Sequence, residues 1–111
     1  MNHHSVYVIE LRKDVLKKQY FLNANPNYDP SKPCVYVGLT GLDPDERFLN
    51  HLFGHKCSRT AKEFGERLLP EMYEHLNPMS YDDAKIKEVE LSRELRSKGY
   101  GVWPPDFPDP E

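Results

Sequence analysis

The sequence predicts a mixed α/β fold of the α+β kind, in which helices flank a small central sheet of three strands. Two segments, residues 5–11 and 34–39, are rich in valine and tyrosine, as strands usually are. Both faces of the first segment are largely apolar, which indicates a strand that is covered on both sides. Helix-capping residues precede three other segments, so helices and strands share one domain.

The clearest helix signal lies between the second strand and Gly54. Asp43 can accept a backbone N–H bond at the start of a helix, and Pro44 suits the first helical position. Glu46, three residues after the cap, completes a capping box. Gly54 is a typical helix end. We therefore expect a helix over residues 44–53.

The remaining elements follow from weaker signals of the same kind. In chain order they are a helical turn or hairpin extension around residues 14–22, a short helix from Ser58 to residue 66, a short strand within residues 67–73, a helix from Ser80 to about residue 98, and a last short strand in residues 100–103.

Length and composition indicate one domain over residues 1–103 and an extended, acidic, proline-rich tail over 104–111. The net charge of −3 comes from the tail, because residues 1–103 carry 15 acidic and 15 basic side chains. A nucleic-acid surface would therefore be a local patch. No apolar run approaches the ~20 residues of a membrane span. The absence of a secretory signal indicates a cytoplasmic protein, with Cys34 and Cys57 as reduced thiols.

One group of polar side chains is expected to meet beside the two strands. Arg47 and His51 are four residues apart and project from the same side of the first long helix. If that helix packs against the strands, both can reach Tyr7 and Tyr36. Gly38 lies on the same strand face as Tyr36, and its missing side chain would leave room for a phosphate.

A carboxylate is expected at the same place from the last helix. Glu88 shares a helical stripe with Ala84, Leu91 and Leu95, which draws it toward the core. Burying a carboxylate is costly without a cation or a hydrogen-bond donor. Glu90 is the alternative, but it belongs to the polar side of the helix.

These residues resemble the GIY-YIG nuclease superfamily. Val6-Tyr7-Val8 stands in the place of the first family tripeptide, and Tyr36-Val37-Gly38 in the place of the second. Residues 36–55 follow the family's strand, turn and arginine helix, and Glu88 resembles its metal-binding glutamate. The resemblance covers roughly residues 5–103 and implies a mainly antiparallel sheet.

Three features depart from the family pattern. The first tripeptide lacks glycine and isoleucine, and residues 12–33 form a longer link than the family usually has. The family often carries an asparagine after the glutamate helix, whereas residues 99–103 contain none. The last departure favours an alternative in which the same fold has lost its activity.

The resemblance implies metal-dependent hydrolysis of a phosphodiester. Glu88 would hold one Mg²⁺ or Mn²⁺, and Arg47 would offset charge on the phosphoryl group. Tyr7 or Tyr36 would orient or deprotonate the attacking water, with His51 assisting. The residues expected to contact substrate are Gly38, His55, Lys56 and Arg59.

Each residue also has a simpler explanation. Tyrosine is common in strands for structural reasons, and Arg47 could form an ion pair with Asp43 or Asp45. A zinc site of His51, His55 and Cys57 is a weaker alternative, because no fourth ligand is evident. The interpretation as a nuclease site therefore depends on all of these residues together, in the order in which they occur along the chain.

The sequence thus predicts a small endonuclease that acts on nucleic acid, with DNA favoured over RNA. The alternatives are a catalytically silent nucleic-acid-binding module and a protein-interaction domain that uses its tail. A single short domain suggests low sequence specificity or a protein partner that supplies targeting. The sequence leaves the oligomeric state open.

Overall fold

The computed structural model describes residues 2–55 and 57–104. Four strands and four α-helices, with three short 3₁₀ helices, make up this part of the chain. In order they are β1 (Ser5–Leu11), η1 (Lys13–Lys17), α1 (Gln19–Ala24), β2 (Cys34–Thr40), α2 (Pro44–Leu52), α3 (Arg59–Phe64), β3 (Gly65–Leu68), η2 (Pro70–Met72), η3 (Glu74–Leu76), α4 (Tyr81–Ser97) and β4 (Gly101–Trp103).

The four strands form one mixed sheet in the order β3-β1-β2-β4. The central strand β1 is antiparallel to both β2 and β3, and its register places Tyr7 opposite Gly38. The short strand β4 runs parallel to the first residues of β2. The expected sheet of three strands was therefore wrong by one strand, although the mainly antiparallel pairing is present.

The strand predicted in residues 100–103 is β4, Gly101–Trp103, whereas one other strand position differs from the prediction. The strand expected within residues 67–73 is β3, Gly65–Leu68, because Pro70 begins a 3₁₀ helix instead. The fourth strand is fixed by Asn25, whose side chain accepts from the backbone N–H of Val102 at 2.9 Å and donates to its carbonyl at 3.0 Å. Such a side-chain clamp from a distant residue leaves no local sequence signal.

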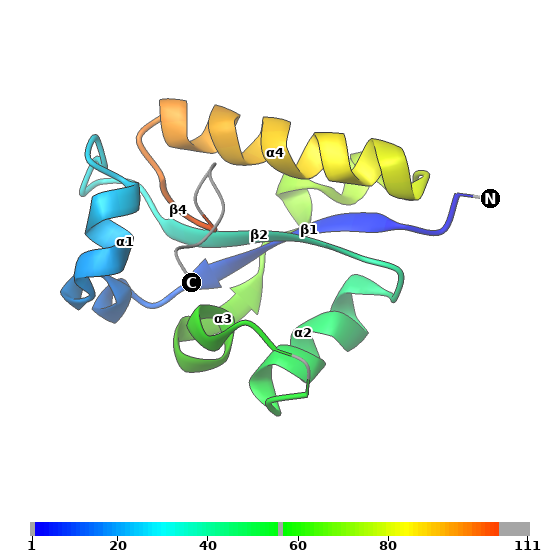
Figure 1. Cartoon of the computed structure of the whole chain (residues 1–111), viewed down its shortest axis with the longest axis horizontal. Coiled ribbons are helices and arrows are strands. Elements are labelled where there is room, and N and C mark those ends of the chain that lie inside the picture. Colours follow the sequence, from blue (N-terminus) through cyan, green and yellow to red (C-terminus); the bar gives the residue numbers. More distant parts are fainter. Residues whose placement is uncertain (1, 56, 105–111) are drawn as a thin grey trace.

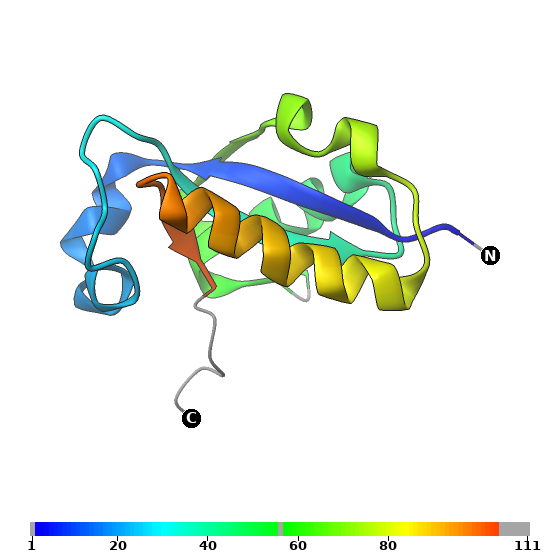
Figure 2. The ribbon, with the colours of Figure 1, turned by 90° about the horizontal axis from the view of Figure 1, so that it is seen from above.

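Helices cover both faces of the sheet. Figure 1 shows α4 on one side of the sheet and α2 with α3 on the other, and Figure 2 shows α4 lying across it. The strand β1 is therefore covered on both faces, as its apolar composition predicts, and is nearly inaccessible along its length. Of the helices in the described residues, none combines the length and the apolarity that a membrane crossing requires.

The predicted helix starts are confirmed by their capping bonds. The Asp43 side chain accepts from the Asp45 N–H at 2.9 Å, and Ser80 accepts from the Asp83 N–H at 3.1 Å. Ser58 caps α3 through the N–H of Ala61. The helix α3 ends at Phe64, two residues earlier than expected, because the chain passes directly into β3.

The long link between β1 and β2 belongs to the core. Its 3₁₀ helix buries Val15, and α1 buries Phe21, which has no exposed surface. Asn25, at the end of α1, is 3% exposed and forms the clamp on β4. The extra length that departs from the GIY-YIG pattern thus supports the sheet edge. The predicted tail lies outside the described residues except for Pro104.

Candidate active site

The centre of the candidate site is a buried hydrogen bond between β1 and α2. The hydroxyl of Tyr7 lies 2.9 Å from Nε2 of His51. Tyr7 is 1% exposed and His51 is fully buried. The helix α2 packs on β1, so residues 44 positions apart are brought into contact. The predicted meeting of the helix face with the first tyrosine is confirmed.

The protonation state of His51 follows from its second contact. The backbone N–H of Ser58 donates to Nδ1 of His51 at 3.1 Å, so Nδ1 carries the lone pair. In a neutral imidazole the proton must then be on Nε2, and His51 donates to the Tyr7 oxygen. Burial, with a smaller contribution from the charge of Arg47, lowers the pKa of His51 to about 4. His51 is therefore a neutral donor near pH 7.

Gly38 makes room for Tyr7. A Cβ atom at position 38 would lie 2.6 Å from both Cζ and Oη of Tyr7. Real Cβ contacts of that length essentially do not occur, so the tyrosine ring occupies the space that a side chain would need. We expected a phosphate to use this space. The structure instead assigns Gly38 to the packing of the site.

Tyr36 forms the outer wall of the same cluster. Its ring centroid lies 5.3 Å from that of His51 and 6.2 Å from that of Tyr7. Burial raises the pKa of Tyr36, Glu88 raises it further, and Arg47 lowers it. Both tyrosines are therefore hydroxyls in the free protein at neutral pH.

Arg47 projects its charge into this cluster. Burial raises the pKa of Tyr7 and the neighbouring Tyr36 adds to the rise, whereas Arg47 opposes it. Arg47 is half-buried and forms no ion pair with a carboxylate in the described part of the chain. The alternative pairing with Asp43 or Asp45 is thus not found.

Glu88 reaches the cluster from the opposite layer. It is half-buried on α4, between the buried residues Ala84 and Leu91, and burial raises the pKa of its carboxyl. Its charge acts on Tyr36. Glu90 is exposed and forms an ion pair with Lys87 at 3.1 Å. The choice of Glu88 over Glu90 agrees with this placement.

The surroundings of Glu88 suit a single hard cation. Within residues 2–55 and 57–104, Glu88 has neither a salt bridge nor a hydrogen bond that would satisfy its carboxylate. Mg²⁺ is often held by one or two carboxylates, with waters and substrate phosphates completing its shell. Among the described residues no three metal-ligating side chains converge, which also removes the zinc alternative. Both ring nitrogens of His51 are already engaged.

A hollow of about 470 Å³ opens beside the cluster. It shares Tyr36 and Ser58 with the site and is lined by Tyr20, Arg59 and Trp103 as well. Of the predicted substrate contacts, Arg59 thus lies next to the site, His55 is exposed on the surface, and Lys56 lies outside the described residues.

Ser58 is the site residue that the sequence analysis missed. We assigned it only as a helix cap, and it is one, but its N–H also fixes the tautomer of His51. A backbone contact depends on how the chain turns between α2 and α3. No residue pattern in the sequence records it.

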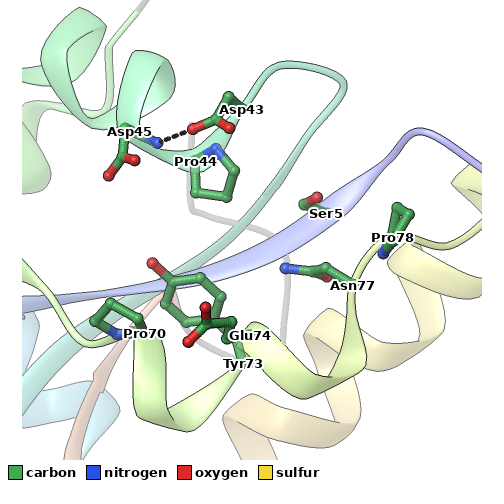
Figure 3. Close-up of a pocket in the computed structure, with 9 residues that line it drawn as sticks. All are labelled: Ser5, Asp43, Pro44, Asp45, Pro70, Tyr73, Glu74, Asn77 and Pro78. Carbon is green, nitrogen blue, oxygen red and sulfur yellow. Dashed lines mark hydrogen bonds between the residues drawn. The ribbon is translucent and has the colours of Figure 1, made fainter.

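A second hollow, of about 350 Å³, lies at the other end of α2 and is acidic (Figure 3). Asp43, Asp45 and Glu74 line it around Tyr73. Burial raises the pKa of Tyr73 to about 12, with these carboxylates adding to the rise. Such a surface repels phosphate. The surface at this end of α2 is therefore unfavourable for an anionic ligand.

Comparisons of the chain with protein-family models, curated proteins and solved structures give no match. The GIY-YIG resemblance therefore rests on the residues of the chain and on their order alone.

Proposed function

We propose that the protein is a metal-dependent endonuclease of the GIY-YIG type that hydrolyses phosphodiester bonds, with DNA favoured over RNA. One observation carries the proposal. Four separate elements bring a tyrosine pair, a guanidinium, a neutral imidazole and a carboxylate to one place: Tyr7 on β1, Tyr36 on β2, Arg47 and His51 on α2, and Glu88 on α4.

Glu88 is the residue that would hold the metal ion. Its carboxylate is half-buried and has no protein partner within the described residues, so its oxygens are available to a hard cation such as Mg²⁺ or Mn²⁺. A bound divalent cation would supply a Lewis acid for the phosphoryl oxygen and a lower pKa for water.

Tyr7 or Tyr36 would orient the attacking water or accept its proton. The Tyr7 oxygen accepts the His51 Nε2–H, and its hydroxyl also interacts with Tyr36 and Arg47. Arg47 lowers the pKa of both tyrosines, whereas Glu88 raises the pKa of Tyr36 and Tyr36 raises that of Tyr7. Since burial raises the pKa of both tyrosines, either would orient the water as a hydroxyl in the free protein.

Arg47 would bind the scissile phosphate and stabilise the charge that develops on it. A guanidinium at the edge of a partly buried site acts strongly on a phosphoryl group, because little water screens it. Its charge already influences Tyr7, Tyr36 and His51, so one phosphate could contact Arg47 and remain near both hydroxyls.

The test is a nicking assay with Glu88→Gln and a matched control, Glu90→Gln. Supercoiled plasmid, single strands, branched DNA and RNA are each incubated with Mg²⁺ or Mn²⁺. We expect metal-dependent cleavage that falls by roughly 10²- to 10³-fold in Glu88→Gln. Glu90→Gln should cleave like the wild type, since Glu90 is exposed and paired with Lys87. Equal rates in all three proteins would refute the assignment.

A second candidate is a nucleic-acid-binding module without activity. The burial of Tyr7 and His51 favours it, because a catalytic hydroxyl must reach its substrate. Binding that weakens steeply with salt, together with no cleavage of any substrate by the wild type, would support this candidate over the first.

A further inference from the structure

The hollow beside the candidate site is walled by aromatic rings. Tyr20 from α1, Tyr36 from β2 and Trp103 from β4 all line it. Its volume of about 470 Å³ falls within the roughly 300–1,000 Å³ that is usual for small-ligand sites. Three rings from three elements therefore face one space large enough for a planar group.

Two of these rings are held in place before any ligand arrives. Tyr20 packs edge-on against Trp103, with ring centroids 4.9 Å apart and planes at 72°. The Tyr20 hydroxyl is 2.9 Å from Oγ1 of Thr60, at the start of α3. Fixed rings lose little conformational entropy on binding, so they form a favourable stacking surface.

The hollow is continuous with the candidate active site. Tyr36 lines the hollow, and its ring lies 5.3 Å from that of His51. Ser58 lines it too, and its N–H donates to His51. A group bound in the hollow would thus contact Tyr36 and Ser58, which also belong to the candidate active site.

The charge at the rim suits a phosphate. Arg59 is exposed and lines the hollow, whereas the acidic residues Asp43, Asp45 and Glu74 line the hollow at the other end of α2. Arg47 acts on Tyr36, which lines the hollow, so a strand that contacts both Arg59 and Arg47 would run beside the aromatic rings. The ligand expected there combines a flat apolar face with an anionic backbone.

We propose that this hollow binds an unpaired base of a nucleic-acid strand, next to the phosphate at the candidate active site. The proposal rests on the proposed function and names its substrate class: single-stranded or locally unpaired nucleic acid. A base inside a duplex has both faces covered by its neighbours and cannot enter. Stacking on tyrosine and tryptophan tolerates any base sequence, which fits a domain without a separate recognition module.

The test uses Trp103, the only tryptophan of the chain, as the reporter. Its fluorescence is followed while a short oligothymidylate, a blunt duplex of the same length, or the mononucleotide dTMP is added in EDTA. We expect a saturable change with the single strand and binding at least about tenfold weaker for the duplex. Tyr20→Ala should weaken single-strand binding by about 5- to 100-fold, as expected for the loss of one stacking ring.

Matched variants separate stacking from other effects. Tyr20→Phe keeps the ring and should bind like the wild type. Tyr81→Ala removes another exposed tyrosine, which lies outside the hollow, and should also bind like the wild type. Arg59→Gln should make the affinity for the single strand less dependent on salt concentration, by about the amount expected for one lost phosphate contact. The preference for single strands over duplex should remain.

The outcomes distinguish this proposal from the proposed function. Equal binding by the wild type and Tyr20→Ala, equal affinity for duplex and single strand, or equal affinity for dTMP and the strand would each overturn it. Stacking that depends on Tyr20, in a protein that cleaves nothing, would refute hydrolysis and leave the base site standing. Cleavage that needs Glu88 but is unchanged by Tyr20→Ala would refute the base site alone.

Discussion

Gly38→Ala tests the central packing of the candidate site. The added Cβ would lie 2.6 Å from Cζ and Oη of Tyr7, whereas ordinary contact begins at 3.4 Å, so the ring must move by about 0.8 Å. Tyr7 cannot move that far without disturbing its 2.9 Å bond to His51. Both rings are buried, so neighbouring atoms have little space in which to adjust.

The expected cost can be worked out from these contacts. Overpacking of a buried site costs about 1–3 kcal/mol, and the disturbed hydrogen bond adds about 1 kcal/mol. Alanine recovers roughly 0.5–1 kcal/mol over glycine in a strand. The net loss is about 1–3.5 kcal/mol, with a central value of about 2 kcal/mol. With a urea m-value of about 1–3 kcal/mol per molar, a loss of about 2 kcal/mol lowers the unfolding midpoint by roughly 0.7–2 M.

Urea unfolding followed by circular dichroism measures this directly. Gly41→Ala is the control, because its Cβ would meet only the His4 side chain, with Nε2 nearest at 3.3 Å, in an exposed bend. In a Tyr7→Leu background the conflict disappears, so Gly38→Ala should then cost almost nothing. A Gly38→Ala midpoint equal to that of the wild type would show that Tyr7 does not fill this space.

Two further predictions concern stability. Since burial lowers the pKa of His51 to about 4, the unfolded chain binds its proton first, and stability is lost as the pH falls from about 6.5 to about 4. The loss of about 3 kcal/mol should be largely absent in His51→Gln and retained in His75→Gln. Urea titrations at several pH values measure the free energy of unfolding. If it falls equally with pH in the wild type and in His51→Gln, the prediction is incorrect. Asn25→Ala should cost about 2–3 kcal/mol because it leaves the buried Val102 N–H without its acceptor. Asn23→Ala, an exposed control, should change the melting temperature little, and comparable losses for both would contradict the clamp on β4.

Features that depend on near neighbours could be predicted from the sequence. The starts of α2, α3 and α4 follow from Asp43, Ser58 and Ser80, because a cap bonds to a backbone N–H two or three residues away. The strands β1 and β2 follow from their apolar runs. These interactions are complete within a few residues, so the local sequence contains all the information needed.

The grouping of the candidate site was predicted less directly. The spacing of Arg47 and His51 places them on one helix face. The contact of this face with Tyr7 was expected from the order of the residues and from the family resemblance. Glu88 was preferred over Glu90 from the apolar stripe of α4, and the ion pair of Glu90 with Lys87 agrees with that choice. Helical periodicity thus identifies which side of a helix turns inward.

Only the tertiary structure decided the finer properties of the site. The tautomer of His51 depends on the Ser58 N–H, the role of Gly38 depends on the register that places it opposite Tyr7, and the side-chain clamp on β4 comes from Asn25. Each is a contact between residues that packing brings together from different elements. The sequence alone determined the elements and the chemical groups they carry, whereas the distances that set protonation, burial and access arise only when the layers pack.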